Sequence, residues 1–252
     1  MSQEATGLRS QLNPVSATAA RVADAGDQPW TGLLRAAGLG ALLTGLLIPL
    51  QVVAFIAWPP PEGGATEWFA LFQDNPIRGL VSFDLLILLE EVLLIPIALA
   101  LYLLLRRGSA SLMLVASAMW FVSIVLFVSA NTGFEMLTLS DAHATAATET
   151  QRAAYLAAGE GMLAAYMGQG TSFVMGYVLA SIAGILVGVA MLRTPVFGRV
   201  AAYSAIAANG LGFGLFLSGI GILLSLVSVL ILMIWFLLIG WRLLRHSATG
   251  AI

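Results

Sequence analysis

The sequence predicts an all-α, polytopic membrane protein with six transmembrane helices and an outer amphipathic helix between the third and the fourth. Of its 252 residues, 60% are hydrophobic and only 10% are charged, whereas soluble domains are about 25% charged. Apolar runs long enough to cross about 30 Å of hydrocarbon recur along the chain. All eleven basic residues are arginines, and they cluster in alternate connections between these runs.

Polar tails are predicted at both ends of a transmembrane domain that covers residues 31–246. Residues 1–30 lack an apolar run and are expected to form a disordered cytoplasmic tail, and residues 247–252 form a second one. The six predicted spans are residues 33–58, 80–105, 111–130, 171–192, 200–217 and 220–244.

The first three spans are bounded by recognisable end signals. Trp30 and Trp58 flank the first span, where interfacial tryptophans are enriched, and the prolines at 59–61 end it. Arg106 and Arg107 close the second span and begin a tight Arg-Arg-Gly-Ser turn into the third.

The last three spans differ in their packing surfaces. Every fourth residue along one face of the fourth span is small: Gly176, Ala180, Gly184 and Gly188. Such spacing predicts close contact with another helix. The fifth span repeats the pattern from Gly210, and the sixth is rich in Leu and Ile and is expected to face lipid.

The arginines also predict the orientation. With six spans, nine of the eleven lie on the side that holds both termini, and only Arg78 and Arg152 lie on the other. Short cytoplasmic loops carry excess basic residues, so both termini are predicted to be cytoplasmic. The absence of lysine is typical of GC-rich bacterial coding, which favours a bacterial cytoplasmic (inner) membrane.

Three acids within the second predicted span, Asp84, Glu90 and Glu91, are the main functional signal. Each costs about 2.5–3.5 kcal/mol at bilayer depth, so intramembrane acids usually have a function. At 100° per residue Asp84 and Glu91 face the same way and Glu90 points roughly 100° aside. Because no basic residue lies at matching depth, we expect neutral polar groups, water, a cation or a retained proton as partners.

Depth counting along the other spans suggests candidate partners for these acids. Asn209, Tyr177, Ser181 and Ser123 fall near the central level, and Gln51 falls nearer the outer third. Together with the acids, these residues predict a ligand-binding pocket that opens to the outer side.

The amphipathic helix is predicted from the segment 152–168. One of its faces carries Leu156, Glu160, Leu163 and Met167, so an acid interrupts an apolar stripe. We expect this helix to cover the outer mouth of the bundle and to point Glu160 inward, towards Glu135 and Asp84.

Structural alternatives exist for each acid. Asp84 could be an interfacial acid that is solvated or paired with Arg78, and Glu90 with Glu91 could be a hydrogen-bonded pair that only fixes helix packing. Glu135 and Glu160 could be solvated acids that cap nearby helices.

Several chemistries are excluded or disfavoured. A net charge of −2 without a basic run gives no support for a nucleic-acid partner, and a chain without cysteine has no thiolate or disulfide. His143 and His246 are predicted on opposite sides of the membrane, so they cannot share a haem or zinc. No cofactor or metal site is predicted, with carboxylate binding of a hard cation at Glu90 and Glu91 as a minor alternative.

Four stretches together resemble one known family: NPIRGLVSFDLLILLEE, FEMLTLSDAHA, QRAAYLAAGEGMLAA and MLRTPVFGR. They are similar to the uncharacterised bacterial integral membrane proteins grouped as domain of unknown function four-three-eight-six. The resemblance covers residues 33–246. It implies a six-helix bacterial membrane protein and supplies no reaction.

Three functions remain open from the sequence. The chain could bind or translocate a small lipophilic or cationic molecule, with Glu91 and Asp84 as counter-ions or proton carriers. It could be an intramembrane enzyme in which Glu90 or Glu91 protonates a prenyl or lipid-like substrate and Asp84 or Glu135 acts as base. It could also be a non-catalytic scaffold. The bilayer is the one partner the composition requires, and the oligomeric state is left open.

Overall fold

A computed structural model describes residues 30–167 and 170–249, and all regular elements in these ranges are helices. The predicted N-terminal tail lies outside them, apart from Trp30. The helices are α3 (Thr31–Ala57), α4 (Ala65–Asp74), α5 (Pro76–Ser82), α6 (Leu85–Ala130), α7 (Gly133–Ala144), α8 (Glu149–Met167), α9 (Thr171–Leu192), α10 (Gly198–Gly212), the 3₁₀ helix η1 (Phe213–Phe216) and α11 (Gly221–Thr249).

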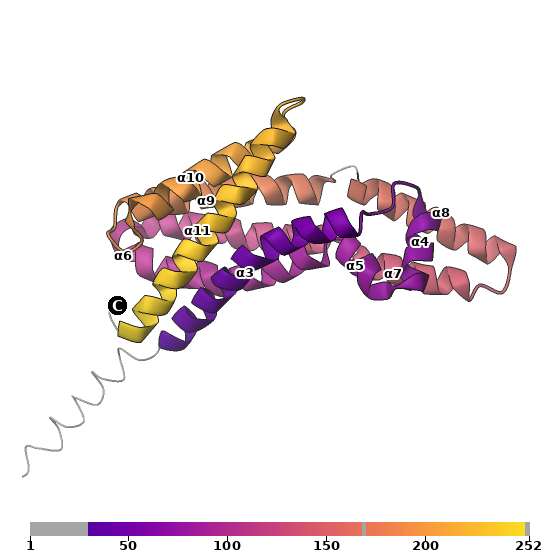
Figure 1. The fold of residues 1–252 in the computed structure, drawn as a ribbon, viewed down its shortest axis with the longest axis horizontal. Coiled ribbons are helices and arrows are strands. Elements are labelled where there is room, and N and C mark those ends of the chain that lie inside the picture. The colour runs from indigo at the N-terminus through magenta and orange to yellow at the C-terminus, as the bar shows by residue number, and fades with distance from the viewer. Residues whose placement is uncertain (1–29, 168–169, 250–252) are drawn as a thin grey trace, which may run out of the picture.

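The helices form two regions (Figure 1). Helices α3, α6, α9, α10 and α11 make a bundle, and α4, α5, α7 and α8 gather at one end of it as a cap. Four stretches of the described chain are long and apolar enough to cross a membrane: Thr31–Ala57, Leu85–Ala144, Glu149–Leu192 and Gly221–Ala248. Their length and composition are consistent with a membrane protein.

The 46-residue α6 is a hairpin. A straight helix of that length would span about 69 Å, yet Asn131, just past its end, donates a hydrogen bond from Nδ2 to the carbonyl of Phe83, just before its start, at 2.8 Å. The chain reverses at Ser109, whose φ of −160° and ψ of 55° are non-helical. This reversal falls within the Arg-Arg-Gly-Ser turn, so the two arms correspond to the second and third predicted helices.

Three predicted boundaries are wrong. The second helix does not run from residue 80, because α5 ends at Ser82 and α6 begins only at Leu85. Phe83 leaves the helix and is fully buried in the cap. The fifth helix ends at Gly212 and continues as a 3₁₀ turn; its 15 residues span about 22 Å, less than a bilayer core. In addition, α11 continues to Thr249, past the expected start of the C-terminal tail.

Small residues set the distances between helices in the bundle. A Cβ on Gly188 of α9 would lie 2.9 Å from the carbonyl oxygen of Ala202 on α10, and one on Gly176 would lie 3.3 Å from Leu126 on α6. The glycine ladder therefore packs between these two helices, as predicted. On the opposite side, a Cβ on Gly240 of α11 would lie 2.9 Å from the carbonyl oxygen of Gly38 on α3.

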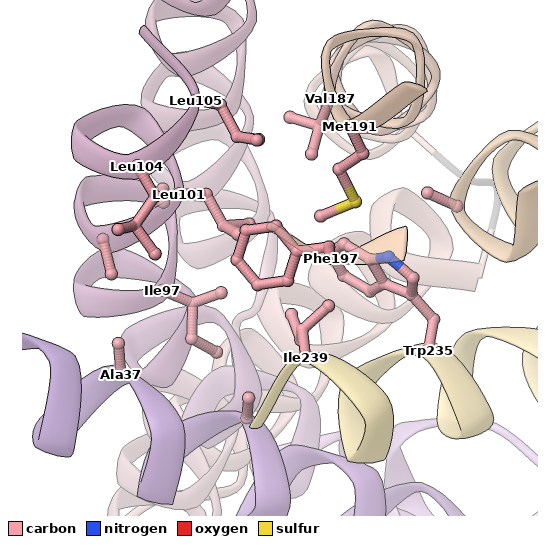
Figure 2. Close-up of a cluster of buried hydrophobic side chains, with 14 of the residues drawn as sticks. Ala37, Ile97, Leu101, Leu104, Leu105, Val187, Met191, Phe197, Trp235 and Ile239 are labelled. Carbon is pink, nitrogen blue, oxygen red and sulfur yellow. The ribbon is translucent and has the colours of Figure 1, made fainter. Parts of the chain in front are cut away.

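The hydrophobic core of the bundle lies where these helices meet (Figure 2). Phe197, from the turn between α9 and α10, sits among side chains from both α6 and α11, including Leu101 and Ile239. Alanine is the most frequent residue in this core, which lets the helix backbones approach closely.

Arginines gather where the bundle ends away from the cap, at a surface we call the arginine end. Arg193 contacts the α6 reversal through Ser109 Oγ at 3.5 Å, and Arg242 of α11 donates to the carbonyl of Val196 at 3.1 Å. The start of α3 and the end of α11 lie at this same end, opposite the cap (Figure 1).

The cap has a hydrophobic core of its own. Its fully or nearly fully buried members are Ala65, Trp68, Phe69, Phe72, Phe83, Met136 and Leu163. Ser140 of α7 donates a 3.0 Å hydrogen bond to the carbonyl of Phe69, and Gln73 of α4 donates to Ser140 at 3.0 Å. The cap therefore consists of four packed helices. One of them, α8, occupies the segment for which the sequence predicted a single amphipathic helix.

Candidate functional site

Two neighbouring cavities lie beside the first arm of α6. The junction cavity, of about 260 Å³, lies between the cap and the bundle, and its lining includes Asp84, Leu88, Glu91, Phe127, Asn131, Tyr166 and Thr171. The bundle cavity, of about 190 Å³, is lined by residues that include Thr44, Glu90, Glu91, Trp120, Phe127, Tyr177, Ser181, Asn209 and Trp235. Glu91 and Phe127 line both cavities, which places the two spaces directly next to each other.

Asp84 ties three helices together at the junction cavity. It has a left-handed backbone, with φ of 63°, between α5 and α6. Asp tolerates this region better than most residues because its short polar side chain bonds locally. Its carboxylate accepts a hydrogen bond from Gln51 Nε2 of α3 at 3.3 Å and another from the hydroxyl of Tyr166 on α8.

The partners of Asp84 are neutral, as the absence of nearby basic residues suggested. Gln51, selected from its depth, is one of them. Asp84 directly precedes α6, and burial raises the pKa of its carboxyl, while the hydrogen bonds from Tyr166 and Gln51 act in the opposite direction. The carboxylate of Asp84 bonds Gln51 and Tyr166, and these contacts do not support the alternative in which Asp84 pairs with Arg78.

Asp84 lies outside α6, although the predicted directions of the three acids assumed one continuous helix through Asp84, Glu90 and Glu91. Asp84 and Glu91 nevertheless both line the junction cavity, and Glu90 lines only the bundle cavity. The rotation of about 100° between consecutive helical residues separates Glu90 from the junction cavity.

Three of the central-level candidates line the bundle cavity with the acids: Asn209, Tyr177 and Ser181. Asn209 donates to the carbonyl of Ala205 at 2.8 Å, and the Tyr177 hydroxyl donates to the carbonyl of Gly212 at 3.0 Å. The side chains of Asn209 and Tyr177 therefore donate to backbone carbonyls and not to the carboxyl groups of Glu90 or Glu91. Ser123 is buried but is not part of this lining.

Several polar atoms around the bundle cavity have no hydrogen-bond partner within the described residues. These are Thr44 Oγ1, Glu90 Oε1, Glu91 Oε2 and Trp235 Nε1. An unpaired buried polar atom costs about 1–3 kcal/mol, and more when it is charged. In the part of the chain that the structure describes, no basic side chain lines either cavity. The bundle cavity therefore offers acidic groups whose hydrogen bonds the protein does not complete.

Glu160 and Glu135 are placed elsewhere, and the inward-pointing arrangement proposed for Glu160 is wrong. Its Oε1 accepts a 2.8 Å hydrogen bond from the backbone N–H of Ala65, the first residue of α4. Gly64, at the N-cap of α4, has no side chain to cap that helix, so the carboxylate of Glu160 does so. Glu135 is exposed in the first turn of α7, where an acid complements the helix dipole.

Sequence reasoning missed three residues of the site: Tyr166, Thr44 and Trp235. Tyr166 follows the buried Leu163 by three residues, so helical spacing places it near the buried face of α8. Thr44 and Trp235 are isolated polar or amphipathic residues in apolar spans, a weak signal on its own.

Comparisons of the chain with protein-family models, curated proteins and solved structures return no match. The resemblance to an uncharacterised bacterial family stays a prediction. Function has to be inferred from the two cavities and the acids between them.

Proposed function

We propose that this protein takes a small lipophilic or cationic molecule into an acidic pocket from the outer side of a membrane, and either holds it there or passes it across. The observation that carries this proposal is the position of Glu91. Its side chain lines both cavities. Asp84 and Glu91 therefore line the junction cavity, and Glu91 and Glu90 line the bundle cavity directly next to it.

The proposed topology has six spans: α3, the two arms of α6, α9, α10 with η1, and α11. The four long apolar stretches support it, and so do the reversal of α6 at Ser109 and the antiparallel return of α10 after α9. We place the arginine end in the cytoplasm of a bacterium and the cap outside its inner membrane, because short cytoplasmic loops carry excess arginine. Both termini are then cytoplasmic.

The chemistry of the pocket suits a positively charged or polarisable guest. A molecule would meet Asp84 first, and Glu91 lies about 9 Å beyond the start of α6 at Leu85. Within the bundle, Glu90 and Glu91 each have a carboxyl oxygen that finds no hydrogen-bond partner among residues 30–167 and 170–249. Burial of these oxygens without partners is unfavourable. A ligand that supplies positive charge or hydrogen-bond donors to them removes this penalty, and the free energy recovered contributes to its affinity.

Cysteine accessibility tests the proposal, because the natural chain contains no cysteine. Single variants would place a thiol in the junction cavity (Ser172→Cys), in the bundle cavity (Ser181→Cys), on the exposed cap (Thr138→Cys) and at the arginine end (Thr194→Cys). The measurement is the rate of reaction with a small, membrane-impermeant methanethiosulfonate added to intact cells.

We expect Thr138→Cys and Ser172→Cys to react rapidly, Ser181→Cys to react more slowly, and Thr194→Cys to react only after permeabilisation. The proposal is contradicted if both cavity thiols stay unreactive while the cap thiol is labelled. Labelling of Thr194→Cys in intact cells would contradict the orientation.

A further inference from the structure

We propose that the bundle cavity binds a small organic cation with an apolar body, an amine or a quaternary ammonium, between the carboxyl groups of Glu90 and Glu91 and a wall of aromatic rings. This inference rests on the proposed function and specifies its ligand class. Three features of the cavity select this class: its rings, its unpartnered polar atoms and its size.

The aromatic wall supplies the first reason. Trp120, Phe127, Tyr177, Trp235 and Phe236 all line the bundle cavity, and the rings of Trp120 and Trp235 lie 6.4 Å apart. The faces of aromatic rings attract cations, most strongly those of Trp, and the attraction is larger when the site is desolvated. Rings and carboxylates in one cavity suit a cation that also carries apolar surface.

The unpartnered polar atoms supply the second reason. Thr44 and Trp235 both line the cavity and are only 3% and 1% exposed, and each has a buried polar atom without a hydrogen-bond partner in the described residues. Glu90 and Glu91, which line the same cavity, each have one buried carboxyl oxygen that no group in the described residues hydrogen-bonds. Buried groups of this kind normally have partners, so their convergence on one space points to a ligand that completes them.

Size and ligand geometry supply the third reason. A cavity of about 150 Å³ holds benzene, and this one, at about 190 Å³, holds a slightly larger body. Hard metal ions such as Ca²⁺ require six to eight oxygen ligands. Within the described residues no group of three or more His, Cys, Asp or Glu is placed to hold a metal ion. Two carboxylates with an aromatic wall match an organic monocation better.

The experiment uses the full-length Ser181→Cys protein in membranes and asks whether a ligand protects the thiol. The probe is benzyltrimethylammonium, and the matched control is neopentylbenzene, which has the same shape without the charge. We expect saturating benzyltrimethylammonium to slow thiol labelling by on the order of tenfold, and neopentylbenzene to have little effect.

Charge variants sharpen the test. Glu90→Gln and Glu91→Gln, each combined with Ser181→Cys, should weaken protection by the cation, whereas Glu135→Gln, at an acid outside both cavities, should leave it unchanged. Titration of the unaltered protein gives an independent readout: the cation should produce a saturable change in tryptophan fluorescence, because Trp120 and Trp235 line the cavity.

The outcomes separate this inference from the proposed function. If the neutral isostere protects as well as the cation, or if neither Gln variant weakens protection, the organic-cation class is overturned while the reactive Ser181→Cys thiol still supports an accessible pocket. Absence of both protection and a fluorescence change also overturns the class. If Ser181→Cys and Ser172→Cys never react from outside, both proposals fail.

Discussion

The cap and the bundle are held together by opposite means. The cap core is built from large aromatic residues, with Trp68 and Phe83 in edge contact at a centroid distance of 4.9 Å. The bundle core is rich in alanine, and glycines such as Gly188 bring helix backbones into contact. Side chains also cap the N-termini of two cap helices: Glu160 caps α4 and Asn75 caps α5.

This difference follows from the solvent that each region meets under the proposed topology. In water, burial of large apolar side chains is the dominant stabilising term, so a small region gains most from aromatic residues. Between helices in lipid that term is absent, because the acyl chains are as apolar as leucine. Close packing through small residues then provides the stabilisation.

We expect the largest loss of stability from a substitution in the cap core. Phe83 is fully buried between Trp68 and Tyr166, so Phe83→Ala should destabilise the cap by about 3–5 kcal/mol. Hydrogen–deuterium exchange in detergent should rise in α4, α7 and α8 and stay unchanged in α9 and α10. Phe134→Ala, at an exposed cap residue, is the control and should change little. Equal acceleration in cap and bundle would show that they are one cooperative unit.

A second, smaller effect is expected in the bundle. Gly188→Ala places a methyl group against the backbone of Ala202, which cannot move without shifting α10, and should cost about 2 kcal/mol. Gly210→Ala is the matched control, because a Cβ there has no neighbour within 4 Å. That change should be neutral or gain up to about 1 kcal/mol from helix propensity. Unfolding in mixed detergent micelles measures both, and identical midpoints would refute close packing at Gly188.

The smallest expected effect is at the contact between the two regions. Tyr166→Phe removes only the hydroxyl that donates to Asp84 and leaves Gln51 as a partner, so it should cost about 1 kcal/mol. Amide exchange in α8 should become faster, with α4 and the bundle unaffected. Tyr155→Phe, on the same helix, is the control. If the two variants exchange alike, the Asp84 contact does not hold α8 in place.

The bundle was more predictable from the sequence than the cap. Hydrophobic length, the Arg-Arg-Gly-Ser turn and the four-residue ladder are local patterns, and each predicted a feature of the structure. Depth counting also brought Asn209 and Tyr177 to the level of Glu90 and Glu91. The cap core joins Trp68, Phe83, Met136 and Leu163 from four separate segments, and no local period links residues so far apart.

The break before α6 was missed for a different reason. Hydropathy runs smoothly from α5 into α6, so nothing in the apolar pattern marks the left-handed conformation of Asp84. The prediction for Glu160 is wrong because it assumed that the stripe packs against the bundle, whereas the carboxylate accepts a hydrogen bond from the backbone N–H of Ala65 in α4.

The left-handed residue before α6 connects the cap directly to the helix that bears the buried acids. Tyr166 holds Asp84, and Asp84 is joined covalently to the two helical turns that bear Glu90 and Glu91. Under the proposed topology, a ligand or partner that displaced α8 would therefore act first on Asp84, at the start of the helix that bears both buried acids.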